Sequence, residues 1–234
     1  GDQASLSKNG LNPQLNWVFK QADDPLTLTA SGFVCQSKQS GTTQQLASFY
    51  NRNVVKPESW STIQKDLNQR LPIYKASFKQ SAAKYNLDWH LLAAIGYQES
   101  YLKPSSVSPT GVRGLMMLTN STAQAMGVSN RSDPIQSIQG GAKYYDLMLD
   151  QFANVPFPDR NWYALVAYNM GRGAVNQIQK QIKAQGKAPN QWVNLYDYLQ
   201  RNQARNGRYK QAVQYVTRIR TYLEHLKTSN RIDV

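Results

Sequence analysis

Residues 89–118 read WHLLAAIGYQESYLKPSSVSPTGVRGLMML, in which an apolar run gives way to small and polar residues. Apolar residues in the first half recur at steps of three and four, the spacing of one face of an α-helix. Asp88 precedes the run and is suited to cap this helix. Pro104 should end it, because proline disfavours the helical conformation of the residue before it. We therefore expect a helix over residues 89–102 and a loop over 105–113.

Glu99 falls on the apolar face of this expected helix, together with Leu91, Leu92, Ile95 and Leu102. Burial disfavours the charged form of a carboxyl group and raises its pKa. Such a group can hold a proton at neutral pH and deliver it to a leaving oxygen. The same spacing also fits a structural role, in which Glu99 pairs with one of the 27 lysine and arginine residues.

Acidic residues are scarce around Glu99. The chain has three glutamates, and no acid occurs between Ser100 and Ser132. Glycosidases with two catalytic carboxyl groups place them roughly 5 to 10 Å apart. The next acid, Asp133, precedes a proline and is better explained as a helix cap. The pattern therefore favours a mechanism that uses a single acid.

The rest of the chain predicts a mainly α fold, because helical periodicity is frequent and alternating runs of β-branched residues are scarce. A joint near residues 53–57 divides the chain into an N-terminal segment of short helices, 1–55, and a larger domain, 56–234. In the larger domain the expected helices are 60–71 and 73–85, meeting near Pro72, then 118–126, 134–152, 162–170, 174–184, 191–200 and 209–226.

The formal net charge of +13 favours contact with polyanions such as nucleic acid, anionic lipid headgroups or a cell wall. Nucleic acid is the least favoured, because the basic residues form no stripe with interleaved aromatic residues along one helix. With one cysteine, Cys35, and two histidines, we expect no intrachain disulfide, no metal and no cofactor. No segment reaches the roughly 20 consecutive apolar residues of a membrane span, so we expect a soluble chain.

Three ordered motifs make the larger domain recognisable. They are Glu99-Ser100, the run GLMMLT at 114–119, and Ala167-Tyr168-Asn169. Together they resemble the family 1 lytic transglycosylases, whose catalytic domain is similar to goose-type lysozyme. The strings at 93–100 and 108–114 resemble the membrane-bound F-type subgroup in particular. The resemblance covers roughly residues 57–227 and implies a lysozyme-like helical domain.

The resemblance also implies a reaction on peptidoglycan. Glu99 would protonate the glycosidic oxygen between N-acetylmuramic acid and N-acetylglucosamine, and the C6 hydroxyl of the muramic acid would attack its own anomeric carbon. The product is a 1,6-anhydro end, and Glu99 would finally take up the hydroxyl proton. Two alternatives are a goose-type hydrolase that uses water and a catalytically silent module that binds the cell wall; the intact Glu99-Ser100 favours an enzyme.

The family motifs assign further residues to the substrate site. Ser100 would hydrogen-bond near the carboxyl group or the sugar, Met116 would pack under a sugar ring, and Tyr215 would face Glu99. The full set of implied substrate-binding residues is Ser100, Gly114, Leu115, Met116, Met117, Tyr168, Asn169 and Tyr215. Each has a structural alternative: the methionines and tyrosines can be core residues, and Asn169 can belong to a helix C-cap. Met117 stands where the family more often has glutamine.

The N-terminal segment, 1–55, resembles more weakly the last helices of the solute-binding-like regulatory domain that precedes the catalytic domain in F-type enzymes. From the family we expect a periplasmic protein, associated with the outer membrane in its full-length form. Its expected partner is the glycan strand of peptidoglycan, and we expect a monomer.

Overall fold

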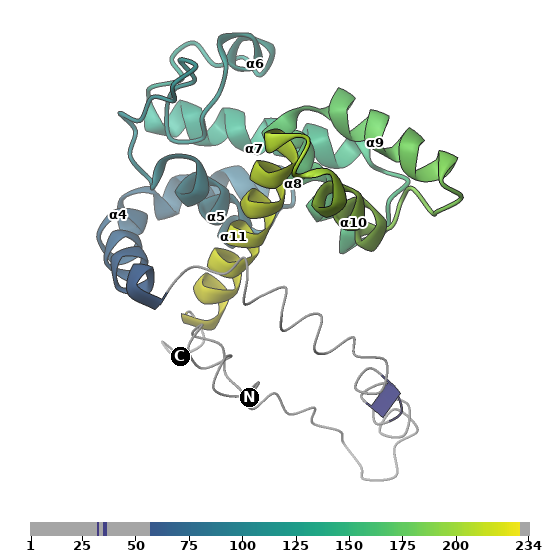
Figure 1. Cartoon of the computed structure of the whole chain (residues 1–234). Helices are drawn as coiled ribbons and strands as arrows, with labels where there is room; N and C mark the ends of the chain where they lie inside the picture. The colour runs from purple at the N-terminus through teal and green to yellow at the C-terminus, as the bar shows by residue number, and fades with distance from the viewer. Residues whose placement is uncertain (1–31, 33–34, 37–56, 230–234) are drawn as a thin grey trace. The chain divides into compact units, whose positions relative to one another are not determined.

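The computed structural model describes residues 57–229 together with residues 32, 35 and 36 (Figure 1). Residues 57–229 form helices joined by loops. Within these residues, isolated β-bridges near residues 107–118 are the only β-type pairing. The helices are α4 (Pro57–Lys84), α5 (Trp89–Ser100), α6 (Asn120–Ala125), α7 (Pro134–Gln151), α8 (Asp159–Met170), α9 (Arg172–Ala184), α10 (Trp192–Asn202) and α11 (Gly207–Ser229). The predicted mainly α class is confirmed. The helices expected within residues 1–55 lie outside the described residues.

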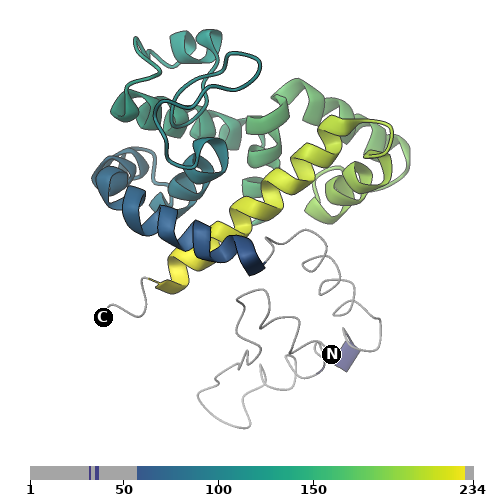
Figure 2. The same ribbon diagram turned by 60° about the vertical axis from the view of Figure 1, so that its left-hand side comes forward.

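Residues 62–234 make up one of the two compact units into which the chain divides, and the contacts discussed below lie within it. Helix α11 crosses the unit as a long diagonal and packs against α5 and α8, while α7 packs against α8 (Figures 1 and 2). The core of the unit includes Phe78 of α4 and, from α5, α8 and α11, the residues Leu92, Ile95, Leu165 and Ile219, all fully buried. Each such side chain contributes about 1.5–3 kcal/mol on burial, so the core fixes α5 firmly in place.

The predicted helix caps are confirmed. Asp88 accepts a hydrogen bond from the backbone N–H of His90 at 2.9 Å, and Asp133 accepts one from that of Gln136 at 2.8 Å. Helix α5, however, ends at Ser100 and not at residue 102, because Tyr101 and Leu102 adopt left-handed conformations with φ of 54° and 57°. This turn directs Leu102 back into the core, where it is 1 % exposed.

The predicted break at Pro72 is wrong, since α4 runs without interruption from Pro57 to Lys84. A proline inside a helix removes one N–H donor and leaves the carbonyl group four residues earlier without its helical partner. Here Pro72 and Asn68, which carries that carbonyl, both lie on the exposed side of the helix. Water can therefore satisfy the carbonyl, while Leu71 and Phe78 continue the buried face.

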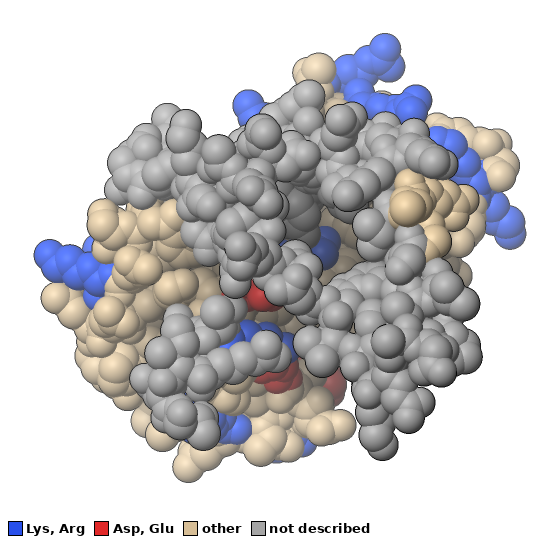
Figure 3. Space-filling view, turned by 90° about the horizontal axis from the view of Figure 1, so that it is seen from below, with Lys and Arg blue, Asp and Glu red and all other residues tan. Residues whose placement is uncertain are grey.

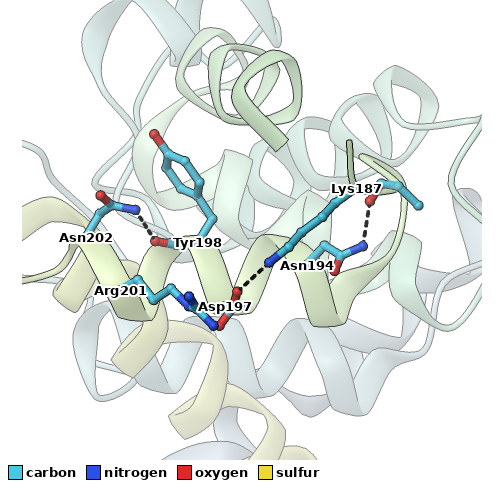
Figure 4. A network of polar contacts seen from close by, with 7 residues as sticks. Lys187, Asn194, Asp197, Tyr198, Arg201 and Asn202 are labelled. Carbon is cyan, nitrogen blue, oxygen red and sulfur yellow. Dashed lines mark hydrogen bonds and ion pairs between the residues drawn. The ribbon is translucent and has the colours of Figure 1, made fainter. Parts of the chain in front are cut away.

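A polar network joins the loop after α9 to α10 (Figure 4). The carboxylate of Asp197 receives Lys187 Nζ at 3.2 Å and Arg201 Nε at 2.8 Å. Asn194 Nδ2 also donates to the carbonyl oxygen of Ala188 at 2.9 Å. Partial burial acts to raise the pKa of Asp197, but the hydrogen bonds from Arg201 and Lys187 outweigh it and hold the pKa below its usual value.

The surface charge agrees with the basic composition. On the face drawn in Figure 3, the lysine and arginine side chains of the described residues lie in separate groups.

None of the helices described between residues 57 and 229 combines the length and the apolar character that a bilayer span requires.

Candidate active site

Glu99 lies in the last turn of α5 and is only partly exposed. Its Oε1 accepts a hydrogen bond of 2.6 Å from the hydroxyl of Tyr215, a residue of α11 that is 4 % exposed. Burial raises the pKa of Glu99 from 4.5 to about 7, although the hydrogen bond from Tyr215, which favours the carboxylate, acts in the opposite direction. Near neutral pH the group can therefore both donate and accept a proton.

Tyr168 of α8 also lies close to the carboxyl group. Burial raises the pKa of Tyr168 well above its usual value, and the charge of Glu99 adds to this effect. The Tyr168 hydroxyl does not donate to Glu99; it donates to the carbonyl oxygen of Met116 at 2.9 Å. Tyr168 thus connects α8 to the loop beside Glu99, while Tyr215 contacts the carboxyl group itself.

The loop after α5 is held by side chains from three helices. The hydroxyl of Ser100 lies 2.8 Å from the carbonyl oxygen of Leu115 and 3.1 Å from that of Gly96. The hydroxyl of Ser137 in α7 accepts a hydrogen bond from the backbone N–H of Met116 at 2.9 Å, and Tyr168 binds the carbonyl group of the same residue. Residues 115 and 116 are therefore fixed against the end of α5.

Gly114 allows the sharp turn that leads into this segment. Its φ is 88°, and an added Cβ would lie 1.9 Å from the carbonyl oxygen of Arg131. The left-handed backbone and the close approach both require glycine. Arg131 in turn donates from Nη1 to the carbonyl oxygen of Leu118 at 2.8 Å, which closes the loop from the other side.

Several residues expected to bind substrate are buried supports of the loop. Ser100 is 2 % exposed, and its hydroxyl donates to the backbone carbonyl groups of Leu115 and Gly96. Leu115 and Met116 are fully buried. An added Cβ at Gly141 of α7 would lie 2.7 Å from Met116 Cβ, so this methionine packs inside the protein and its side chain is not open to a sugar ring.

Two of the expected residues do retain surface. Asn169 is exposed at the end of α8, where Gly171, with φ of 90°, caps the helix. Met117 is partly exposed and adopts a left-handed conformation with φ of 49°. These two side chains, together with the carboxyl group of Glu99, are the parts of the predicted set that a ligand can reach.

Two residues near the site, Ser137 and Tyr144, carried no direct signal in the sequence. Ser137 is a fully buried serine within α7, and Tyr144 is a partly exposed tyrosine whose ring centre lies 5.1 Å from that of Tyr168. The adjacent Gly140-Gly141 pair is a signal that could have drawn attention to α7, since glycines in a helix often mark a close approach. Among the described residues, histidine, cysteine, aspartate and glutamate nowhere gather in a group of three that could hold a metal ion.

Known proteins are similar to this chain in sequence or in fold. Residues 76–191 match the family model for the transglycosylase SLT domain. The chain is 42% identical over 233 residues to the membrane-bound lytic murein transglycosylase F of Stutzerimonas stutzeri (strain A1501), a match covering 93% of this chain and 47% of the relative. It is 43% identical over 224 residues to the protein of that name from Pseudomonas fluorescens (strain Pf0-1), covering 90% of this chain and 46% of the relative. The chain thus spans about half the length of these relatives.

Two solved structures share the fold at low sequence identity. The lytic transglycosylase Slt of Pseudomonas aeruginosa, an inactive mutant, matches with a TM-score of 0.54 and 21% identity over 79% of this chain and 28% of the other. The 70 kDa soluble lytic transglycosylase of Escherichia coli matches with a TM-score of 0.53 and 17% identity over 94% of this chain and 39% of the other. The predicted lysozyme-like fold is confirmed.

Proposed function

The chain belongs to the transglycosylase SLT family, and from this premise we propose that it cleaves peptidoglycan glycan strands by a non-hydrolytic mechanism. The bond broken is the β-1,4 linkage between N-acetylmuramic acid and N-acetylglucosamine. The observation that carries the proposal is the carboxyl group of Glu99, whose pKa of about 7 suits a group that acts first as an acid and then as a base.

In the first step the protonated Glu99 donates its proton to the glycosidic oxygen, and the bond from that oxygen to C1 of the muramic acid breaks. In the second step the C6 hydroxyl of the same sugar forms a bond to C1, and its proton passes to the Glu99 carboxylate. The product carries a 1,6-anhydro ring, and no water is consumed. The acid is regenerated, so one carboxyl group serves both steps.

Tyr215 has a positioning role in this scheme. Its hydroxyl occupies Oε1 of Glu99 at 2.6 Å, which leaves Oε2 for the sugar. Because the hydroxyl donates, it stabilises the carboxylate that forms after the first step. Asn169 and Met117 would contact the glycan directly, whereas Ser100, Leu115 and Met116 would act through the shape of the loop.

The wider setting is also part of the proposal. Residues 56–234 would form the catalytic domain, and residues 1–55 would be the end of a preceding regulatory domain. The names of the relatives describe membrane-bound proteins. We infer for this protein a monomer in the periplasm that is attached to the outer membrane when full-length.

Digestion of purified peptidoglycan sacculi tests the proposal. Mass spectrometry of the released muropeptides should find 1,6-anhydro ends with the parent chain and at least about a hundredfold fewer with Glu99→Gln. Reducing ends alone would contradict the proposal and identify a hydrolase of the goose lysozyme kind. No release by the parent, with retained binding to sacculi, would instead identify a silent binding module.

A further inference from the structure

A second concave site lies apart from Glu99, where the end of α4, the segment after α6 and the first half of α7 meet. This is the side of the unit away from α9 and α10 (Figures 1 and 2). The cavity has a volume of about 380 Å³, and the residues that line it include none of those that surround Glu99. The neighbouring residues Gly140 and Gly141 of α7 separate the cavity from the loop beside Glu99. An added Cβ at Gly140 would meet Val128 of the cavity wall, whereas one at Gly141 would meet Met116 of that loop.

The lining of this cavity is basic and rich in hydrogen-bond donors. Lys84 of α4 and Lys143 of α7 contribute ammonium groups, and Gln80 and Gln139 contribute amide groups. No aspartate or glutamate lines the cavity to neutralise the lysines. A site with two cations and no acid favours an anionic ligand.

Ser81 adds a buried polar group to the same wall. The residue is 5 % exposed, yet it lines the cavity. A hydroxyl on the cavity wall can both donate a hydrogen bond to a ligand and accept one from it.

The chemistry of the lining favours a carboxylate on a peptide over a phosphate group. Arginine, which binds phosphate in a two-pronged geometry, is absent from the residues that line the cavity. The glutamine amides can both donate to and accept from peptide groups. The volume falls within the range of about 300–1,000 Å³ that is typical of small-molecule sites, which leaves room for more than a single small anion.

We propose that this cavity binds the free carboxylate of an acidic peptide, at a site separate from the catalytic carboxyl group. The inference rests on the proposed function in one respect: the peptide stems of peptidoglycan are acidic and would be the natural source of such a ligand. A strand held by its stem at this cavity has a higher local concentration at Glu99, which would lower KM for strands that retain their stems.

Amide NMR titration of the whole chain with the dipeptide N-acetyl-Glu-Glu tests the proposal. The backbone signals of Gly127 and Gly140 should move and saturate, and the uncharged N-acetyl-Gln-Gln-amide should cause no saturable shift. The double variant Lys84→Gln/Lys143→Gln should weaken binding by roughly tenfold or more, because hydrogen bonds to charged groups are lost. Ser81→Ala should weaken it by about threefold.

The matched control is Lys75→Gln/Lys79→Gln. These two lysines belong to the same helix, α4, but lie over the ring of Trp89 and not in the cavity. This variant removes the same charge and should change the dipeptide affinity by less than about twofold. Equal weakening in both double variants, equal binding of inorganic phosphate, or no saturable shift at all would each overturn the proposal.

The titration needs no turnover, so its result is independent of the proposed function. A chain that binds the dipeptide but releases no anhydro ends from sacculi contradicts the proposed reaction alone. A chain that releases anhydro ends but does not bind the dipeptide contradicts the cavity proposal alone.

Discussion

The surroundings of two carboxyl groups, Glu99 and Asp197, shift their pKa values in opposite directions. Asp197 receives Lys187 and Arg201 at the surface, and these contacts hold its pKa below the usual value in spite of partial burial. Glu99 is bound by a neutral tyrosine hydroxyl, and burial raises its pKa to about 7. The comparison shows that pairing with cations fixes an acid in its charged form, whereas a buried acid bound by a tyrosine keeps a proton available for transfer.

The largest expected difference between the two groups is catalytic. Glu99→Gln should reduce the release of anhydro muropeptides by roughly 10²–10⁴-fold, because general acid–base catalysis contributes about that much. Asp197→Asn, which makes the equivalent change at the other carboxyl group, should alter the rate by less than about twofold. Turnover on sacculi measures both, and similar losses in the two variants would refute the distinction.

The second difference is the dependence of stability on pH. The folded pKa of Glu99, about 7, exceeds the unfolded value of 4.5, so the unfolded state loses its proton first as pH rises. The free energy of unfolding should therefore fall between pH 4.5 and 7 by up to about 3 kcal/mol through this one group. Glu99→Gln should lack this slope and gain stability relative to the parent at pH 8. Urea denaturation at pH 4.5 and 8 measures it, and parallel profiles would contradict the assigned pKa.

The third difference concerns two backbone turns, one near Glu99 and one in the loop before α10, which carries Asp197. Gly114 beside the site and Gly186 in the loop before α10 both have positive φ, 88° and 74°, but only at Gly114 would an added Cβ meet a backbone atom, at 1.9 Å. Gly186→Ala should cost about 1 kcal/mol from the conformational strain alone. Gly114→Ala should cost at least about 2 kcal/mol more, since the loop must shift. Equal costs in thermal or urea unfolding would show that the loop at Gly114 is not closely packed.

The fourth effect isolates the tyrosine partner of Glu99. The Tyr215 hydroxyl donates to the carboxylate and lowers its pKa, so Tyr215→Phe should raise that pKa further. The alkaline limb of the pH–rate profile should then move to higher pH, because the group stays protonated longer. The rate at its optimum should fall by roughly tenfold, since one hydrogen bond that orients the acid is lost. A limb that stays in place or moves to lower pH would contradict the role given to Tyr215.

The smallest expected effect is the stability cost at Asp197. Exposed ion pairs contribute little, so Asp197→Asn should lower the free energy of unfolding at pH 7 by at most about 1 kcal/mol. Because the folded pKa of Asp197 lies below its ordinary 3.8, this contribution should be lost as pH falls through the folded value, the opposite sign to Glu99. A cost of several kcal/mol would show that this network matters more to the fold than its exposure suggests.

Local signals in the sequence predicted much of the fold. Asp88 and Asp133 were identifiable as caps because an aspartate before a helical run has a defined chemical task there. The apolar face of α5 likewise predicted that Glu99 points inward. The predicted helix break at Pro72 was wrong because the free-energy cost of a proline inside a helix depends on which side of the helix faces water. That side is decided by the tertiary fold.

Contacts between distant residues limited the prediction of the site. The hydrogen bond from Tyr215 to Glu99 joins positions 116 residues apart, and only the family resemblance placed the two together. The resemblance places Met116 under a sugar ring and Ser100 near the carboxyl group or the sugar. Their burial depends on contacts with other segments, since Ser100 donates to Leu115 and Met116 packs against Gly141. Spacing along one helix predicts a face, but it does not predict what packs against that face.

Titration of the Glu99 carboxyl group tests its proposed role as acid and base without relying on turnover. The chain contains three glutamates, Glu58, Glu99 and Glu224, so carbon-13 labelling of glutamate carboxyl groups gives few NMR signals, and Glu99→Gln assigns the one of interest. That signal should show its midpoint near pH 7. A midpoint near 4.5, the ordinary value for a glutamate, would contradict the acid–base role of Glu99.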